Sequence, residues 1–175
     1  MLTLLLGGAR SGKSALAVEM GRRHEGRVVF LATAAPSVDA DMDERIERHR
    51  AERPDWPTIE EPLDLAAALD RCDDALVVVD CLTLWVSNLM NRGDSDAEIE
   101  AASTIAIASA TNREGATVVV SNEVGLGVHP ETTLGLRYRD LLGRVNNQWA
   151  RAADRTLFLV AGRALRLDDP WAFVG

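Results

Sequence analysis

The first 20 residues hold a short apolar run, a glycine-rich segment and a run typical of a helix, and this order limits the folds that the chain can adopt. Residues 2–6 have the length and apolar character of a strand, and residues 15–20 have the composition of a helix start. Between them, residues 7–14 match the phosphate-binding pattern G-x-x-x-x-G-K-[ST] in the strand–loop–helix context that it requires. A chance glycine-rich turn is the alternative, and the flanking strand and helix argue against it. The sequence therefore predicts a phosphate-binding loop built on the first strand.

The residue types in this loop suit the binding of phosphate. Gly7 and Gly12 allow tight turns, so that successive N–H groups point inward at the amino end of a helix and attract an anion. Lys13 supplies a point charge for the β- and γ-phosphates, and the Ser14 hydroxyl can hold Mg²⁺. Of the 19 lysine and arginine residues, Lys13 is the only lysine. The composition therefore avoids lysine except where an ammonium group is needed.

Composition sets the class of protein. A chain of 175 residues predicts a single domain, residues 1–175, with a sizeable core. The net charge of −8 argues against a nucleic-acid partner and against a DNA-binding role. Cys72 and Cys81 lack metal-type spacing and suggest a reducing, cytoplasmic location. No apolar run reaches the length of a membrane span.

The rest of the chain alternates predicted strands and helices, which favours an α/β fold with a parallel sheet covered on both faces. Further strands are expected at 27–32, 75–80, 117–121, 155–160 and 164–167. Helices are expected at 13–23, 39–52, 62–71, 82–90, 97–113 and 136–153, with a long functional loop at 122–135. Ligands of such folds bind beyond the carboxyl ends of the strands. The loops after Leu6, Ala32, Asp80 and Ser121 are therefore the candidate site.

Two carboxylates stand at predicted strand ends. Residues 77–80 have the form of a Walker B strand, so that Asp80 can hold Mg²⁺ directly or through water. The alternative is that Asp80 caps the following helix. Glu123 follows the next strand and can either orient a substrate hydroxyl or a water, or merely begin a turn.

A charged segment, residues 39–53, places one histidine among arginines. On a helix, Met42, Ile46, His49 and Arg53 share one face. Nearby cations lower the pKa of a histidine, and a neutral imidazole is a competent nucleophile toward phosphorus. The arginines could also bind phosphate oxygens. Composition alone favours the alternative, a solvated charged helix with a partly buried structural histidine.

The chain resembles the bifunctional adenosylcobinamide kinase / adenosylcobinamide-phosphate guanylyltransferase family of cobalamin biosynthesis. The stretches that carry the resemblance are Gly7–Ser14, Arg45-Ile46 through His49 to Arg53-Pro54 with Trp56, Asp80–Thr83, Ser121–Gly127 and Gly143–Asn146. They span nearly the whole chain, and the loops Gly-Gly-Ala-Arg-Ser-Gly-Lys-Ser and Asn-Glu-Val-Gly-Leu-Gly are far more specific than the general phosphate-loop pattern. Some members carry two adjacent histidines where this chain has Arg48-His49.

The resemblance implies a RecA-like P-loop NTPase fold with an antiparallel last strand, assembled as a homotrimer. It implies that ATP or GTP phosphorylates the corrinoid substrate with Mg²⁺ held through Ser14 and Asp80. It also implies that His49 carries GMP, taken from GTP, as a phosphoramidate. Nucleotide contacts are implied at Gly7, Gly8, Ala9, Arg10, Ser11, Gly12, Lys13, Ser14, Ala32, Thr33, Ala34, Arg50, Ala51, Glu52, Arg53, Glu60 and Asp80.

Two other functions fit parts of the sequence. A monofunctional P-loop kinase would bind the same phosphates but carry no nucleotide on His49. A GTP-dependent switch protein commonly reads guanine with an Asn-Lys-x-Asp motif, and the only lysine of this chain is already placed in the phosphate loop. The switch function is therefore disfavoured.

Overall fold

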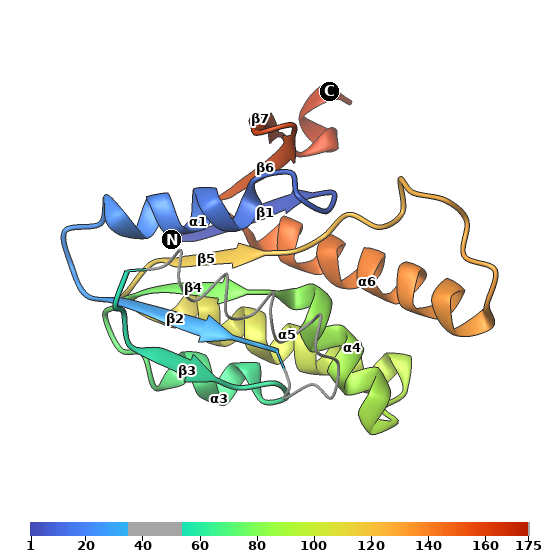
Figure 1. The fold of residues 1–175 in the computed structure, drawn as a ribbon, viewed down its shortest axis with the longest axis horizontal. Coiled ribbons are helices and arrows are strands. Elements are labelled where there is room, and N and C mark those ends of the chain that lie inside the picture. The colour runs from blue at the N-terminus through green and yellow to red at the C-terminus, as the bar shows by residue number, and fades with distance from the viewer. Residues whose placement is uncertain (35–53, 175) are drawn as a thin grey trace.

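The computed structural model describes residues 1–34 and 54–174, and within them seven strands form one sheet (Figure 1). The strands are β1 (Leu2–Gly7), β2 (Val28–Ala32), β3 (Thr58–Glu60), β4 (Leu76–Asp80), β5 (Thr117–Val120), β6 (Arg155–Val160) and β7 (Arg163–Leu167). The helices are α1 (Lys13–Arg22), α3 (Leu65–Asp70), α4 (Leu82–Arg92), α5 (Asp96–Asn112), α6 (Thr133–Ala152) and a 3₁₀ turn at Pro170–Phe173. The strand order is β3-β2-β4-β5-β1-β6-β7.

Every strand pair is parallel except the last. In the centre of the sheet β1 lies between β5 and β6, with Leu5 opposite Val120 and Leu6 opposite Phe158. A tight turn at Ala161 and Gly162 then reverses the chain, and β7 runs antiparallel to β6. The expected mostly parallel sheet with an antiparallel last strand is therefore confirmed.

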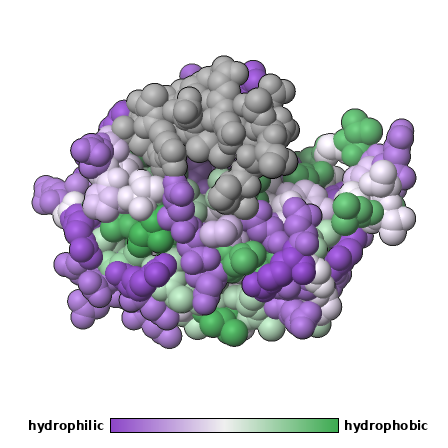
Figure 2. All heavy atoms as spheres, turned by 60° about the horizontal axis from the view of Figure 1, so that its bottom comes forward, coloured by the Kyte–Doolittle hydropathy of each residue, from purple (hydrophilic) through white to green (hydrophobic). Residues whose placement is uncertain are grey.

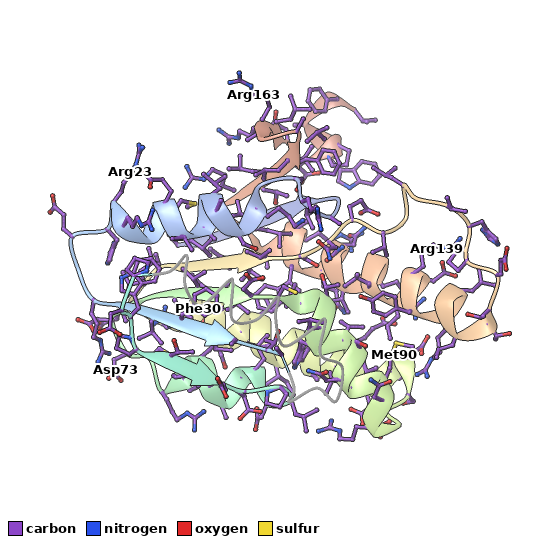
Figure 3. All side chains as sticks on the ribbon, in the orientation of Figure 1. Arg23, Phe30, Asp73, Met90, Arg139 and Arg163 are labelled. Atoms are coloured by element: carbon purple, nitrogen blue, oxygen red, sulfur yellow. The ribbon has the colours of Figure 1, made fainter. Side chains whose placement is uncertain are left out.

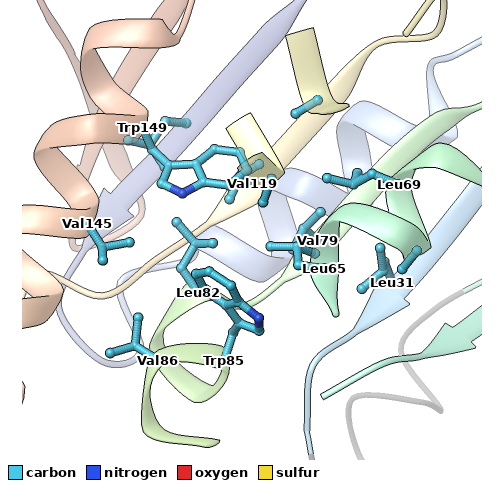
Figure 4. Close-up of a cluster of buried hydrophobic side chains, with 14 of the residues drawn as sticks. Leu31, Leu65, Leu69, Val79, Leu82, Trp85, Val86, Val119, Val145 and Trp149 are labelled. Carbon is cyan, nitrogen blue, oxygen red and sulfur yellow. The ribbon is translucent and has the colours of Figure 1, made fainter. Parts of the chain in front are cut away.

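The strands alternate their side chains between two apolar layers, as a pleated sheet requires. In β4, Val77 and Val79 face the layer beneath α3, α4, α5 and α6, whereas Leu76 and Val78 face the layer beneath α1. Figure 4 shows the larger layer, where Val79 and Val119 of the sheet lie among side chains from the helices. Helices thus cover both faces, as the alternation of strands and helices predicts.

Side-chain caps fix where the helices begin. Helix α3 begins at Leu65 rather than at residue 62, because the Asp64 carboxylate accepts a hydrogen bond from the backbone N–H of Ala67 at 3.1 Å. Ser95 and Glu98 cap each other at the start of α5. Helix α6 begins earlier than predicted, because the Thr132 hydroxyl accepts from the N–H of Gly135.

Two short elements were not predicted from the sequence. Strand β3 has only three residues, and prolines at 57 and 62 flank it closely. It forms because β2 offers an open edge, on which Ile59 lies opposite Leu31. The 3₁₀ turn at Pro170–Phe173 is held by the Asp169 carboxylate, which accepts from the N–H of Trp171. Neither element has the length or periodicity that a pattern search detects.

The surface is mostly hydrophilic on the face that Figure 2 shows, with scattered hydrophobic patches. Among the described residues, no helix has the combined length and apolar character to cross a membrane.

Two buried tryptophans give a matched test of this core. Trp85 and Trp149 are both almost fully buried, but only the Trp85 ring N–H has a partner in the described chain, the carbonyl oxygen of Leu63 at 2.8 Å. Trp85→Phe leaves that carbonyl unpaired, whereas Trp149→Phe removes a donor that already lacks a partner. We expect Trp85→Phe to lower the free energy of unfolding by about 1 kcal/mol more than Trp149→Phe, measured by urea denaturation. Equal losses, or a larger loss for Trp149→Phe, would contradict this description of the core.

Candidate active site

The loop between β1 and α1 has the backbone that its sequence predicts. Gly7 has φ 149° and Gly12 has φ 100°, values that favour glycine. A Cβ at Gly7 would also lie 2.3 Å from the carbonyl oxygen of Leu159 in β6, so a side chain has no room there. Gly12 is the residue before α1, which therefore points its amino end into the loop.

The Lys13 side chain folds back over this loop. Its ammonium group donates to the carbonyl oxygens of Gly7 at 3.0 Å and Gly8 at 2.7 Å, and to the Ser11 hydroxyl at 3.3 Å. Lys13 is buried, with only 6% of its surface exposed. Burying an ammonium is costly unless it is well hydrogen-bonded, and these contacts meet that need. The loop is therefore a cationic enclosure suited to phosphate oxygens.

Segments that follow β5 and β6 hold the loop from both sides. The backbone N–H of Glu123, just after β5, donates to the carbonyl oxygen of Gly7 at 3.0 Å. The N–H of Gly162, in the β6–β7 turn, donates to the carbonyl oxygen of Ser11 at 3.0 Å. Because β5 and β6 are the two neighbours of β1, the sheet order itself positions these contacts.

Asp80 ends β4 at the same edge of the sheet as the loop. Its carboxylate is half-buried and makes no hydrogen bond or ion pair to another described residue. The alternative that Asp80 caps the next helix is wrong, because Cys81, and not Asp80, is the N-cap residue of α4. Ser14 is the second residue of α1 and directly follows Lys13. A hydroxyl and a free carboxylate are the hard oxygen donors that Mg²⁺ prefers, so these residues fit the ion.

Metal sites built from protein side chains alone are a separate matter. Among the described residues, no group of three or more histidine, cysteine, aspartate or glutamate side chains could hold a metal ion. This does not bear on a nucleotide-bound Mg²⁺, which takes most of its ligands from phosphates and water.

The ends of β2 and β3 lie beside Asp80. Ala32 is opposite Asp80 on one side and opposite Glu60 on the other, so the three residues follow one line across the sheet. Thr33 is fully buried. Its hydroxyl accepts from the N–H of Cys81 at 2.8 Å and donates to the carbonyl oxygen of Cys81 at 2.7 Å. Thr33 therefore ties β2 to the segment after β4 and fixes where Asp80 stands.

A buried amide network holds the loop after β5. The Ser121 hydroxyl donates to Oδ1 of Asn146 at 2.6 Å, and Nδ2 of Asn146 donates to the carbonyl oxygen of Asn122 at 3.0 Å. The N–H of Asn122 donates to the Thr83 hydroxyl at 2.9 Å. These bonds join β5, α4 and α6 directly before Glu123, and they keep its backbone against the phosphate loop.

No role for Asn146 was predicted from the sequence, although its position in α6 carries a signal. Its neighbours Leu142, Val145 and Trp149 form the buried face of α6, so that Asn146 is an amide at an apolar position. A buried amide must be hydrogen-bonded, and such a residue commonly fixes a loop.

Burial also decides the protonation of Cys81 and Tyr138. It raises the pKa of the Cys81 thiol to about 12, with the Asp80 carboxylate adding to the rise. The thiol is therefore neutral at physiological pH and a poor nucleophile. Burial also raises the pKa of Tyr138, whose hydroxyl donates to the carbonyl oxygen of Thr83.

The structure brings together most of the predicted nucleotide contacts. The loop Gly7–Ser14, the strand end at 32–34, Glu60 and Asp80 all lie at the carboxyl edge of the sheet. His49, Arg50, Ala51, Glu52 and Arg53 fall outside the described residues.

Comparison with solved structures defines the class of fold. A prototypical ATPase of the type III secretion system aligns with a TM-score of 0.53 and 11% identity, over 91% of this chain and 51% of that one. The flagellar accessory protein FlaH of Methanocaldococcus jannaschii aligns with a TM-score of 0.54 and 12% identity, over 98% of this chain and 79% of that one. At such identities the likeness shows the fold alone, which is the RecA-like P-loop fold.

Sequence comparison then gives the family. The profile described as cobinamide kinase / cobinamide phosphate guanyltransferase matches residues 3–167, and the chain belongs to this family. The bifunctional adenosylcobalamin biosynthesis protein CobP of Pseudomonas aeruginosa is 42% identical over 173 residues, which cover 95% of this chain and 97% of the relative. The protein CobU of Escherichia coli, of the same description, is 36% identical over 182 residues, which cover 95% and 99%.

Removal of the Lys13 ammonium tests the phosphate site. Lys13→Ala should weaken nucleotide binding at least about tenfold, because a charge-assisted contact to phosphate is lost, while the chain stays folded. Isothermal titration with a non-hydrolysable ATP analogue measures the affinity, and circular dichroism measures the fold. Arg23→Ala, an exposed change at the far end of α1, should leave the affinity unchanged. A folded Lys13→Ala protein with wild-type affinity would show that the phosphates bind elsewhere.

Proposed function

We propose that this chain catalyses both reactions of its family in sequence. In the first, ATP or GTP phosphorylates the aminopropanol hydroxyl of adenosylcobinamide. In the second, GMP passes from GTP through His49 to the phosphorylated product, giving adenosylcobinamide-GDP. The observation that carries the proposal is the buried Lys13 ammonium inside the glycine-rich loop, with the Asp80 carboxylate, which has no partner among the described residues, at the same sheet edge.

The kinase step depends on positioning and charge. Lys13 and the N–H groups at the start of α1 bind the phosphates, and they stabilise the charge that builds up on the transferred group. The acceptor hydroxyl attacks the γ-phosphorus and loses its proton to solvent, the bond to the β-phosphate oxygen breaks, and the nucleoside diphosphate leaves. Ser14 and Asp80 would hold Mg²⁺, which neutralises charge on the β- and γ-phosphates when it is bound.

The guanylyl step needs a protein nucleophile. A neutral imidazole of His49 attacks the α-phosphorus of GTP, a nitrogen–phosphorus bond forms and pyrophosphate leaves. The terminal phosphate of the phosphorylated corrinoid then attacks the same phosphorus and releases the histidine. Arg50 and Arg53 follow His49 in the sequence and offer bidentate donors for the departing pyrophosphate. Splitting one displacement into two lowers the barrier of each.

We also propose that the enzyme works in the cytoplasm as a homotrimer. The edge strand β7 supports an assembly, because all five of its residues are exposed and its outer edge has no partner strand among the described residues. Leu165, Trp171 and Phe173 add exposed apolar surface beside that edge.

The metal role of Asp80 is open to a direct test. Asp80→Asn keeps the size of the side chain but removes the charge that Mg²⁺ needs. We expect the Mg²⁺ concentration for half-maximal kinase activity to rise by about tenfold or more. A coupled assay over a Mg²⁺ titration measures this. An unchanged Mg²⁺ dependence would exclude Asp80 from the metal site.

The covalent role of His49 separates the bifunctional enzyme from the monofunctional kinase. The wild-type protein incubated with GTP, labelled at the α-phosphate, and Mg²⁺ should gain one GMP per chain. The adduct should be cleaved by acid and resist alkali, as a phosphoramidate does. His49→Ala should abolish the label and the guanylyl transfer, while phosphorylation of the corrinoid continues, because direct transfer needs no protein nucleophile.

His129→Ala is the matched control, because this histidine lies on the loop before α6 and should not affect labelling. Label retained on a His49→Ala protein would disprove the assignment. A wild-type protein that phosphorylates the corrinoid but takes no label would favour the monofunctional kinase.

A further inference from the structure

A polar hollow of about 770 Å³ lies between the loop after β5 and helices α5 and α6. Glu123 and Gly125 line it from the loop, and Gly143, Asn147 and Arg151 line it from α6. None of the roles assigned above to the phosphate loop or to Asp80 uses this hollow.

The hollow adjoins the phosphate loop through Glu123. The backbone N–H of this residue donates to the carbonyl oxygen of Gly7, while its carboxylate faces the hollow and accepts from the N–H of Gly125 at 2.6 Å. One residue is thus shared between the phosphate site and the hollow. A molecule in the hollow would therefore contact a residue that is itself hydrogen-bonded to the phosphate loop.

Gly143 gives a second, independent indication of an occupant. It stands in the middle of the 20-residue helix α6, where glycine costs about 1 kcal/mol relative to alanine. A Cβ added there would meet no atom within 4 Å, so packing within the described chain does not require a glycine. Its lack of a side chain keeps the floor of the hollow open for something outside this chain.

The loop that borders the hollow contains an exposed apolar stretch. A contact holds the loop on each side of that stretch. Gly125 is held by Glu123, and the His129 ring contacts the Arg139 guanidinium at 2.8 Å. Figure 3 shows Arg139 between α6 and this loop. Between the anchors, Leu126 and Val128 are 77% and 95% exposed. Apolar side chains therefore stand beside a polar floor.

We propose that this hollow is the binding site of the corrinoid acceptor, with the ring over Gly143 and the hydroxyl-bearing arm directed past Glu123 to the phosphate loop. The inference rests on the proposed function and adds the location of its second substrate. A corrin ring has broad apolar faces and a rim of amide groups. Leu126 and Val128 do not line the hollow, but they are exposed on the loop that borders it and suit the faces. Asn147 and Arg151 line the hollow and offer hydrogen-bond donors to the amide carbonyls.

A side chain at Gly143 tests the proposal. Gly143→Leu places bulk in the hollow, and it should raise the KM for cobinamide in the kinase reaction by about tenfold or more. The affinity for nucleotide and the labelling by α-phosphate-tagged GTP should stay at wild-type values, because neither needs the acceptor. Ala108→Leu adds similar bulk to an exposed position on α5 away from the hollow, and it should leave the KM unchanged. Gly143→Ala should be at least as stable as the wild type.

The outcomes separate this inference from the proposed function. A wild-type protein without kinase activity defeats the function itself. An active wild type with an unchanged KM in Gly143→Leu overturns the acceptor site alone. A Gly143→Leu protein whose mass in solution falls, measured by light scattering, shows that α6 faces another copy of the chain, and that result also overturns the acceptor site.

Discussion

The contact between the Lys13 ammonium and the carbonyl oxygens of Gly7 and Gly8 is the interaction on which the rest of the site depends. It holds a positive charge inside a loop whose backbone already points N–H groups inward. The charge is buried, so its interaction with phosphate is screened less than it would be at the surface. Arginine does not fit easily at position 13, because its planar guanidinium group is larger than the compact ammonium group of lysine. This is a physical reason for one lysine in a chain that otherwise uses arginine.

The sheet order turns this local motif into an active site. Since β5 and β6 flank β1, Glu123 and Gly162 reach the loop by backbone hydrogen bonds alone. Asp80 reaches the same edge from β4, and Thr33 fixes the segment that follows it. The contacts that position the site are therefore mostly backbone bonds, which tolerate sequence change. This agrees with a fold shared with a type III secretion ATPase at 11% identity.

Features of the fold and of the site that depend on residues close together in the sequence could be predicted, whereas features that depend on distant residues could not. The phosphate loop was predictable, because glycine, lysine and serine at fixed spacing encode both the turn and the charge. The buried strands were predictable from continuous apolar runs such as residues 76–79. Strand β3 was not, because three residues between prolines show no pattern and the strand depends on the open edge of β2. The network around Asn146 was also missed, since its partners Ser121 and Asn122 are more than 20 residues away in sequence.

The central claim is that one chain performs two chemically different transfers on one corrinoid. Mass spectrometry of the corrinoid, after incubation of the wild-type protein with adenosylcobinamide, GTP and Mg²⁺, tests that claim most directly. The account predicts the phosphorylated corrinoid first and the GDP-linked corrinoid as the final product, with pyrophosphate released. A product that stops at the phosphate, with GTP in excess and no GDP-linked corrinoid at any time, would contradict it.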